Sequence, residues 1–353
     1  MTRPTVVVLG ASGMLGTAVT RELSSRPIRL RAVGRRTPTV PHGCVADVEI
    51  HRADLTEPGE VARATEGADA VMHLVAHTAG AGQWRSADRD TAAERVTVGL
   101  VHDLVDVLAA RERTPVVVFA GTTSQVGRTT AAVLDGTEED HPVTEYDRQK
   151  LAAERALETA TAEGVLHGIT LRLGTLFSQG TDPGVQDRGV VAGMTRRALA
   201  GEPLTMWNDG SVRRDLLCVD DAARAFVAAL DNTDALAGRH WLVGTGEATS
   251  VGELFTAIAR AVSAHTGRPP VPVVSVPPPA ESIAADVVDF VVDPSAFQRA
   301  TGWTARIPLA DALASLAGGH TRTGRAEYTS DTGGITCGPD MIRSAHSGTA
   351  ASE

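Results

Sequence analysis

The sequence predicts an α/β protein in which a doubly wound parallel sheet is followed by a smaller C-terminal substrate-binding domain. Short apolar stretches alternate with helical patterns through the first two-thirds of the chain, which is typical of βαβ crossovers. A glycine-rich turn separates the first apolar stretch from the first helical pattern. After Phe177 the alternation breaks down, which marks the second domain. Together these observations indicate a Rossmann-type fold.

Periodicity places the elements of the first domain in order. Residues 6–9 form an apolar run of the kind found in buried parallel strands. Residues 92–110 form a long amphipathic helix, because apolar side chains recur four apart on one face. The same reasoning predicts strands at 28–33, 48–52, 70–75, 115–120 and 168–173. It predicts helices at 14–23, 58–64 and 146–162.

The remainder of the chain reads as mixed short elements and a tail. Residues 269–279 are proline-rich and form at most an edge strand or an extended loop. From Gly318 onward, Gly, Ser and Thr dominate without a period, so we expect a disordered tail. Strands are expected at 203–207 and 240–243, and helices at 190–200, 220–230, 251–264, 297–301 and 309–316. We therefore assign a nucleotide-binding domain to 1–178, with a return segment near 217–243, a mainly substrate-binding domain to 179–317, and the tail to 318–353.

The amino-acid composition and the net charge argue against several classes of partner and site. The chain has 353 residues, of which 42% are hydrophobic and 22% charged, and this balance indicates a soluble globular protein. The net charge of −10 disfavours nucleic acid and anionic membranes as partners. Cys44, Cys218 and Cys337 are far apart and form no disulfide or zinc pattern, so no metal is expected. No apolar run has the length of a membrane span, and we expect a cytoplasmic protein. The oligomeric state stays open, with a homodimer as one alternative.

Two scarce residues lie four apart. Lys150 is the single lysine among 33 basic residues, and Tyr146 is one of two tyrosines. A compositional bias toward arginine explains why lysine is scarce. Under that bias, the one lysine that remains is expected to do what arginine cannot. On a helix the two side chains share a face. A nearby ammonium favours the phenolate, so the pair is suited to proton transfer at a carbonyl oxygen.

A dinucleotide site is predicted at the glycine-rich turn. Its glycines allow a tight turn and a close approach to a pyrophosphate, and the helix N-terminus supplies amide donors. An NAD site usually carries an acid at the end of the second strand. Arg35 and Arg36 lie there instead, and guanidinium groups suit a 2′-phosphate, so NADPH is the expected cofactor. Asp54 either accepts from the adenine amino group or serves a turn. The expected turn residues are Gly10, Ser12, Gly13, Met14, Leu15 and Gly16.

With these elements the chain resembles the extended short-chain dehydrogenase/reductase family, which includes nucleotide-sugar epimerases, dehydratases and ketoreductases. The chain departs from the family at Thr97, where the family often has Asn. The resemblance covers about residues 5 to 317. Its matching segments are 10–16, Asp54-Leu55, 73–76, the hydroxyl cluster Thr122-Thr123-Ser124, Tyr146 with Lys150, 171–173, and Arg214-Asp215 with 219–221.

The resemblance implies roles for individual residues. Tyr146 would be the general acid/base, and Lys150 would bind the nicotinamide ribose and lower the tyrosine pKa. One of Thr122, Thr123 and Ser124 would bind the reacting carbonyl. Counting back from Gly127 selects Thr122, whereas matching Val126 selects Thr123, which we favour. Further cofactor contacts would come from Leu55, Leu74, Val75 and Ala76.

The substrate side is less sharply marked. Arg214 would meet the substrate diphosphate, and the alternative is a salt bridge with Asp215 or Asp220. His77, Gln83 and Trp84 follow the fourth strand, at the edge of the sheet where ligands bind, and are expected to line the sugar or base site. For Trp84, core packing is an equal alternative. His73 and His77 lie on a strand and its exit loop, so their spacing does not indicate a metal site.

The resemblance also narrows the reaction. Ser124-Gln125 after Thr123 supplies no carboxylic acid, which argues against dehydration. Segments 75–85 and 120–127 look like those of dTDP-4-keto-6-deoxyhexose 4-ketoreductases of antibiotic deoxysugar pathways. The expected function is therefore NADPH-dependent reduction of the 4-keto group of such a nucleotide sugar. The alternatives are a nucleotide-sugar 4-epimerase and a non-catalytic NADP(H)-sensing protein of the same fold.

Overall fold

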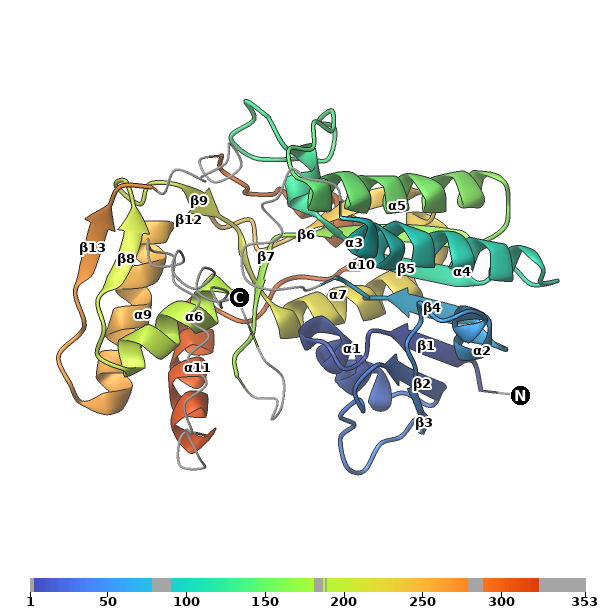
Figure 1. Cartoon of the computed structure of the whole chain (residues 1–353), viewed down its shortest axis with the longest axis horizontal. Coiled ribbons are helices and arrows are strands. Elements are labelled where there is room, and N and C mark those ends of the chain that lie inside the picture. Colours follow the sequence, from blue (N-terminus) through green and yellow to red (C-terminus); the bar gives the residue numbers. More distant parts are fainter. Residues whose placement is uncertain (1–2, 78–89, 181–186, 188, 279–287, 324–353) are drawn as a thin grey trace, which may run out of the picture.

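The computed structural model describes residues 3–77, 90–180, 187, 189–278 and 288–323. Within them, a seven-stranded sheet with all strands parallel lies between two layers of helices (Figure 1). The predicted doubly wound sheet is confirmed. The spatial order of the strands is β11 (Arg239–Val243), β6 (His167–Leu173), β5 (Val116–Thr122), β4 (Ala70–His73), β1 (Thr5–Leu9), β2 (Arg29–Gly34) and β3 (Asp47–Arg52).

Both faces of the sheet are buried because its central strands are apolar throughout. In β1, Val6 and Val8 join one core and Val7 and Leu9 the other, as expected from alternation of side chains along a strand. The first core is covered by α1 (Met14–Ser24), α7 (Val219–Asp231), α8 (Thr233–Leu236) and α10 (Ser295–Thr301). The second is covered by α2 (Glu60–Thr65), α4 (Leu100–Ala109) and α5 (Glu145–Ala162).

A smaller lobe lies at the left of Figure 1. Its separate core is built from the apolar faces of three helices and a strand pair, with Met194, Phe255 and Leu313 among the buried side chains. The helices are α6 (Val190–Leu199), α9 (Val251–Thr266) and α11 (Leu309–Thr323), and the parallel pair is β8 (Leu204–Trp207) with β13 (Val273–Val276). Two further short pairs lie outside the large sheet: β7 (Thr175–Phe177) runs parallel to β10 (Leu216–Cys218), and β9 (Arg213–Arg214) runs antiparallel to β12 (Thr249–Ser250).

Two expectations need correction. The helix predicted for 92–110 is three segments, α3 (Thr91–Glu94), the π-helical turn η2 (Arg95–Gly99) and α4. Residues 318–323, predicted to belong to the tail, form the end of α11 (Leu309–Thr323), and the rest of the predicted tail lies outside the described residues. Gly318 lies near the His265 side chain of α9, and packing of this kind supports a helix where composition does not favour one. Each helix in the described part of the chain is too short or too polar to cross a membrane.

Candidate active site

The turn after β1 forms a cradle that a side chain would fill. Gly10 has a positive φ of 88°, and its N–H donates to the Val33 carbonyl oxygen at 3.0 Å. A Cβ on Gly16 would lie 2.0 Å from the Gly10 carbonyl oxygen, so α1 comes this close only because residue 16 is glycine. The N-cap Gly13 offers no side chain to the first-turn amides of α1. A helix start of this kind fits the pyrophosphate of a dinucleotide.

The predicted arginine pair lies at the edge of this cradle. Arg35 and Arg36 follow β2 and are exposed. The Arg36 guanidinium donates to the Ser12 carbonyl oxygen at 2.9 Å, and the Arg35 carbonyl oxygen accepts from Arg52 Nε at 3.1 Å. The Arg36 side chain is therefore in contact with the cradle, and Arg35 is its neighbour in the chain.

Asp54 lies in a turn. Its Oδ1 accepts from the Thr56 N–H at 3.0 Å and from the Thr56 hydroxyl at 2.7 Å, and the hydroxyl bond is the main cause of its lowered pKa. This is the turn arrangement expected as the alternative to an adenine contact. The adjacent Leu55 is buried.

The segment after β4 closes the other side of the cradle. The Leu74 N–H donates to the Leu9 carbonyl oxygen at 2.9 Å. A Cβ on Gly10 would lie 3.0 Å from the Leu74 carbonyl group, so the two backbones are in direct contact. Leu74, Val75 and Ala76 are partly exposed in this position.

Tyr146 and Lys150 lie in the first turns of α5, beside the end of β5. Lys150 is buried, and its Nζ donates to the Ala120 carbonyl oxygen at 2.8 Å. The same Nζ lies 4.7 Å from the centroid of the Phe119 ring and 5.9 Å from that of Tyr146. Burial lowers the pKa of Lys150 to about 8.

The pKa of Tyr146 differs from expectation. Burial, and after it the charge of Asp147, raise this pKa above its ordinary value. The expected lowering by Lys150 does not appear, because desolvation of the phenolate outweighs the effect of an ammonium that donates to Ala120 instead.

The three hydroxyls of the cluster lie at the junction of β5 and the short helix η3 (Thr123–Val126). Ser124 Oγ donates to Asp147 Oδ1 at 2.5 Å, and Thr122 Oγ1 lies 2.9 Å from Ser124 Oγ. Thr123 is 4% exposed, and its hydroxyl has no hydrogen-bond partner within the described residues. Thr122 also caps η3, together with the side chain of Gln125.

Asp147 is a site residue to which the sequence analysis gave no role. It is buried, and its Oδ2 accepts from the Thr144 hydroxyl at 2.6 Å. The one available sequence signal was the spacing of Thr144 and Asp147, which is that of a helix N-cap and its third residue.

An ionic network lies behind the hydroxyl cluster. The Arg172 guanidinium is bidentate to Asp140, with both distances 2.8 Å, and also donates to Glu154. Glu154 accepts from Gln125 Nε2 at 3.1 Å and lies 3.4 Å from His240 Nδ1. Burial by itself raises the pKa of Glu154, but the hydrogen bonds from His240 and Arg172 outweigh it and lower this pKa to about 2.

A metal site is not favoured at this network. Glu154, Glu158 and His240 lie close enough to hold an ion. The oxygens of Glu154 are, however, already engaged by Arg172 and Gln125. The cluster therefore stabilises the fold behind the site.

Of the four predicted substrate residues, the structure describes two, His77 and Arg214. Gln83 and Trp84 lie outside the described residues. His77 Nε2 lies 3.9 Å from Asp90 Oδ2. Arg214, in β9, donates to the Val288 carbonyl oxygen at 2.5 Å.

The two acids considered as alternative partners of Arg214 are engaged elsewhere. Asp215 accepts from the N–H groups of Thr245 and Gly246. Asp220 pairs with Arg21 and also accepts from Gln179.

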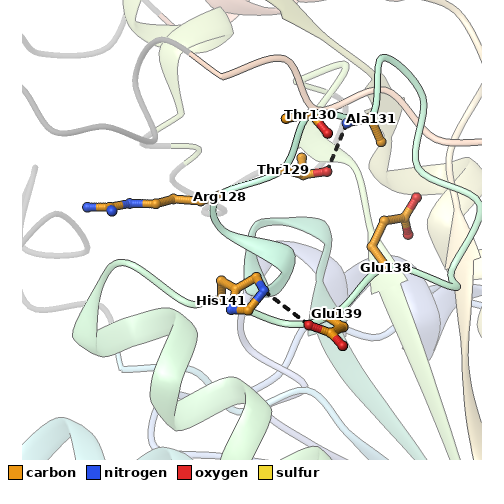
Figure 2. A pocket seen from close by; sticks show the side chains of 7 residues that line it. All are labelled: Arg128, Thr129, Thr130, Ala131, Glu138, Glu139 and His141. Atoms are coloured by element: carbon orange, nitrogen blue, oxygen red, sulfur yellow. Dashed lines mark hydrogen bonds and ion pairs between the residues drawn. The ribbon is translucent and has the colours of Figure 1, made fainter.

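A hollow of about 500 Å³ lies in the loop between η3 and α5 (Figure 2). Within the described part of the chain, none of the predicted site residues lines it. In Figure 2, Arg128 extends away from the other six side chains. The residues that line the hollow are Arg128, Thr129, Thr130, Ala131, Glu138, Glu139 and His141.

Comparison with known proteins connects this geometry to one family. The model of the NAD dependent epimerase/dehydratase family matches residues 6–244. The chain is 31% identical over 247 residues to a 2′-dehydrokanamycin reductase of Streptomyces kanamyceticus, a match that spans 67% of this chain and 62% of that reductase. It is 26% identical over 320 residues to a dTDP-6-deoxy-L-talose 4-dehydrogenase (NAD(P)(+)) of Kitasatospora kifunensis, which spans 88% of this chain and 94% of the dehydrogenase.

A solved structure extends the comparison. That of MoeE5 in complex with UDP-glucuronic acid and NAD has a TM-score of 0.73 at 26% identity and covers 90% of this chain and 99% of MoeE5.

Proposed function

The chain belongs to the NAD dependent epimerase/dehydratase family, and from that membership we propose that it reduces the 4-keto group of a dTDP-4-keto-6-deoxyhexose with NADPH. The observation that carries the proposal is the juxtaposition of Tyr146 and Lys150, on α5, with the hydroxyl cluster at the end of β5. This arrangement can bind a carbonyl oxygen and protonate it.

Each side chain has a distinct task in the proposed reaction. When bound, the reduced dinucleotide supplies a hydride to the carbonyl carbon. Thr123 donates a hydrogen bond to the carbonyl oxygen, and Tyr146 transfers its phenolic proton to that oxygen as negative charge develops there. The Lys150 ammonium, buried beside the ring, stabilises the phenolate that remains.

The preference for NADPH is supported by the arginines at the cradle. Two exposed guanidinium groups follow β2 at Arg35 and Arg36, where an NAD site usually has an acid. Guanidinium groups bind phosphate bidentately. The Kitasatospora relative is named as an enzyme of either cofactor, which is compatible with the phosphorylated one.

The substrate class is supported by the relatives' names. One is a reductase, and another acts at position 4 of a dTDP-linked 6-deoxy sugar. The proposed reaction is the reverse of such a dehydrogenation. In this proposal Arg214, on β9, binds the substrate diphosphate, and His77 faces the sugar.

The test is turnover with purified protein, NADPH and a panel of dTDP-4-keto-6-deoxyhexoses. We expect NADPH to be consumed in proportion to a product that NMR identifies as the C4 alcohol. Conversion of a nucleotide sugar without net consumption of NADPH would instead identify a 4-epimerase. Binding of NADPH without turnover of any panel member would point to the non-catalytic sensor.

A further inference from the structure

Gln125 connects the turn that carries the hydroxyl cluster to helix α5. Its side-chain oxygen Oε1 accepts from the Thr122 N–H at 2.9 Å, and its nitrogen Nε2 donates to Glu154 Oε2 at 3.1 Å. The side chain is 0% exposed, although glutamine ordinarily lies at the surface. The first bond belongs to the capping box of η3, which requires the oxygen alone. The second bond reaches another element, and capping does not account for it.

The partner in that second bond lies on the same face of α5 as the predicted catalytic pair. Tyr146, Lys150 and Glu154 follow one another at intervals of four residues, so their side chains project from one side of the helix. Along this face Lys150 Nζ donates to the Ala120 carbonyl oxygen at 2.8 Å, and Glu154 accepts from Gln125. The end of β5 and the turn after it are therefore tied to this face at Lys150 and again at Glu154.

The local backbone and the two partners both favour glutamine at position 125. A Cβ on Gly121 would lie 3.1 Å from Gln125 Oε1 and 2.8 Å from Thr170 Cγ2, so the glycine lets the Gln125 side chain fold back beside β5. The partners fix which end of the amide faces each of them, because a backbone N–H needs an acceptor and an ionised carboxylate needs a donor. Among side chains of this size, glutamine alone supplies both at neutral pH.

We propose that Gln125 is a positioning residue of the active site, which holds the turn of the hydroxyl cluster in place against the face of α5 that carries Tyr146 and Lys150. The proposal rests on the proposed function only in that it needs a reaction at these side chains, and it applies equally to reduction and to 4-epimerisation. It also gives a physical reason why position 125 is not an acid, because a carboxylate there would face the carboxylate of Glu154 at about the distance of the present hydrogen bond.

The charged groups around this amide come from four elements. Within the described residues, Glu154 faces it from α5, with Glu158 one helical turn further on. Arg172, on β6, pairs with Glu154 and with Asp140, which lies in the loop after η3. His240, on β11, lies 3.4 Å from Glu154. An acid placed at position 125 would therefore be buried next to another acid, and both effects raise the pKa of a carboxyl group.

Two replacements of similar size test the link, in reactions with NADPH and the keto sugar that the wild type turns over fastest. Gln125→Met removes the donor and the strong acceptor, and we expect it to lower kcat by about tenfold to a hundredfold at every pH, the usual cost of misplaced reacting groups. Gln125→Glu restores the link when its carboxyl group is protonated, because a carboxylic acid also has a donor and an acceptor. Its kcat should approach that of the wild type at low pH and fall below it at high pH.

Gln298→Glu is the matched control, because it adds the same charge on α10, on the opposite face of the sheet, and should follow the wild-type profile. Circular dichroism at each pH gives the folded fraction. Gln125→Met with the kcat of the wild type, or Gln125→Glu with a profile parallel to that of the wild type, would overturn the proposal. A Gln125→Glu protein that unfolds as the pH rises, while kcat per folded molecule stays constant, would show a purely structural role. If Gln125→Met does not fold, the Gln125→Glu profile decides alone.

The same measurements separate this proposal from the proposed function. If the wild type interconverts C4 epimers without consuming NADPH, the proposed reduction fails, and the same variants test Gln125 in the epimerisation. If the wild type turns over no nucleotide sugar, both proposals fail, because Gln125 then has no reaction to support. If the wild type reduces keto sugars and Gln125→Met is equally fast, only the role of Gln125 fails.

Discussion

Lys150 occupies a place that a guanidinium does not fit. Its Nζ donates to the Ala120 carbonyl oxygen and lies over the Phe119 ring, in a side chain that is almost fully buried. Arginine is larger and planar, so the charge would be kept but displaced. We expect Lys150→Arg to lower kcat for the reduction by about two to four decades, the usual size of a general acid–base contribution. Steady-state kinetics with NADPH measure this loss.

Tyr146→Phe is the comparison for that variant. It should lose a similar amount of activity and still bind NADPH in a fluorescence titration, because only the proton donor is removed. A Lys150→Arg enzyme with nearly unchanged kcat would show that the single lysine is not part of the catalytic machinery.

The arginine pair predicts the cofactor preference. We expect the wild type to prefer NADPH to NADH by tenfold or more in kcat/KM, which corresponds to about 1.4 kcal/mol. Replacing Arg35 and Arg36 together by alanine should abolish the preference. Arg35→Ala alone isolates the charge effect, since Arg36 also holds the Ser12 carbonyl oxygen. Equal use of both cofactors by the wild type would contradict the prediction.

Single residues also show how far the site could be predicted. Tyr146 and Lys150 stand out in the sequence because both types are scarce and lie one helical turn apart. Asp147 does not stand out, because its partner Ser124 lies 23 residues earlier in the chain. Their hydrogen bond becomes visible only when β5 and α5 are placed side by side.

At the scale of elements, the turn after η3 depends on one glycine. Gly127 has a φ of 66°, and a Cβ there would lie 1.9 Å from the His141 carbonyl oxygen. We expect Gly127→Ala to lower the free energy of unfolding by an amount on the order of 2 kcal/mol or more, because strain and a backbone clash coincide. Denaturant titration measures the loss.

Gly164 provides the matched control for that change. Its φ of 76° is similar, but no atom of the described residues lies within 4 Å of the added Cβ. Gly164→Ala should therefore lose only the strain, about 1 kcal/mol. Equal losses in the two variants would show that the contact with His141 does not limit the turn.

The segment predicted as one long helix shows that an apolar pattern can predict a helical segment without predicting that one of its turns is π-helical. Val96, Leu100, Leu104 and Leu108 recur every four residues, slightly more than the 3.6 residues of an α-helical turn. The wider turn η2, at Arg95–Gly99, takes up part of the excess, and all four side chains reach the same core. The spacing contained this signal, but tertiary packing decides between a bent α-helix and a π turn.

At the scale of the whole molecule, the Arg172 network gives a pH dependence of stability. Glu154 has a pKa of about 2 in the folded protein against an ordinary value of 4.5. Because the folded value is lower, its contribution is complete above pH 4.5 and is lost as the pH falls toward 2. We expect the free energy of unfolding to decline across this interval, as measured by denaturant titrations at several pH values.

Glu154→Gln tests the assignment. It should lose on the order of 3 kcal/mol at neutral pH, since one partner of a buried ion pair is removed, and its stability should fall less steeply with acid. Glu253→Gln is the control, because it also removes one carboxylate but leaves the buried ion pair in place. Glu253 belongs to the capping box of α9, with Ser250 as the N-cap, and its hydrogen bonds there are exposed. A Glu154→Gln slope equal to that of the wild type would assign the acid sensitivity to other groups.

The architecture of the large sheet follows from the sequence, whereas the short strand pairs outside it do not. Apolar runs in alternation with helices suffice for the parallel strands, as in Val6–Leu9. Strands of two or three residues such as Arg213–Arg214 and Leu216–Cys218 are too short for any period. Their pairing depends on segments that are distant in the chain.

Asp221 has a consequence for the order in which this protein is made. It lies buried at the start of α7, on the sheet, yet it pairs with Arg224 and accepts from the N–H groups of Arg306 and Ile307. The Trp303 indole N–H donates to the backbone carbonyl oxygen of Asp221. A ribosome delivers α7 some eighty residues before Trp303, Arg306 and Ile307. The sheet can therefore assemble early during synthesis, but Asp221 gains these three partners only when nearly the whole described chain has emerged.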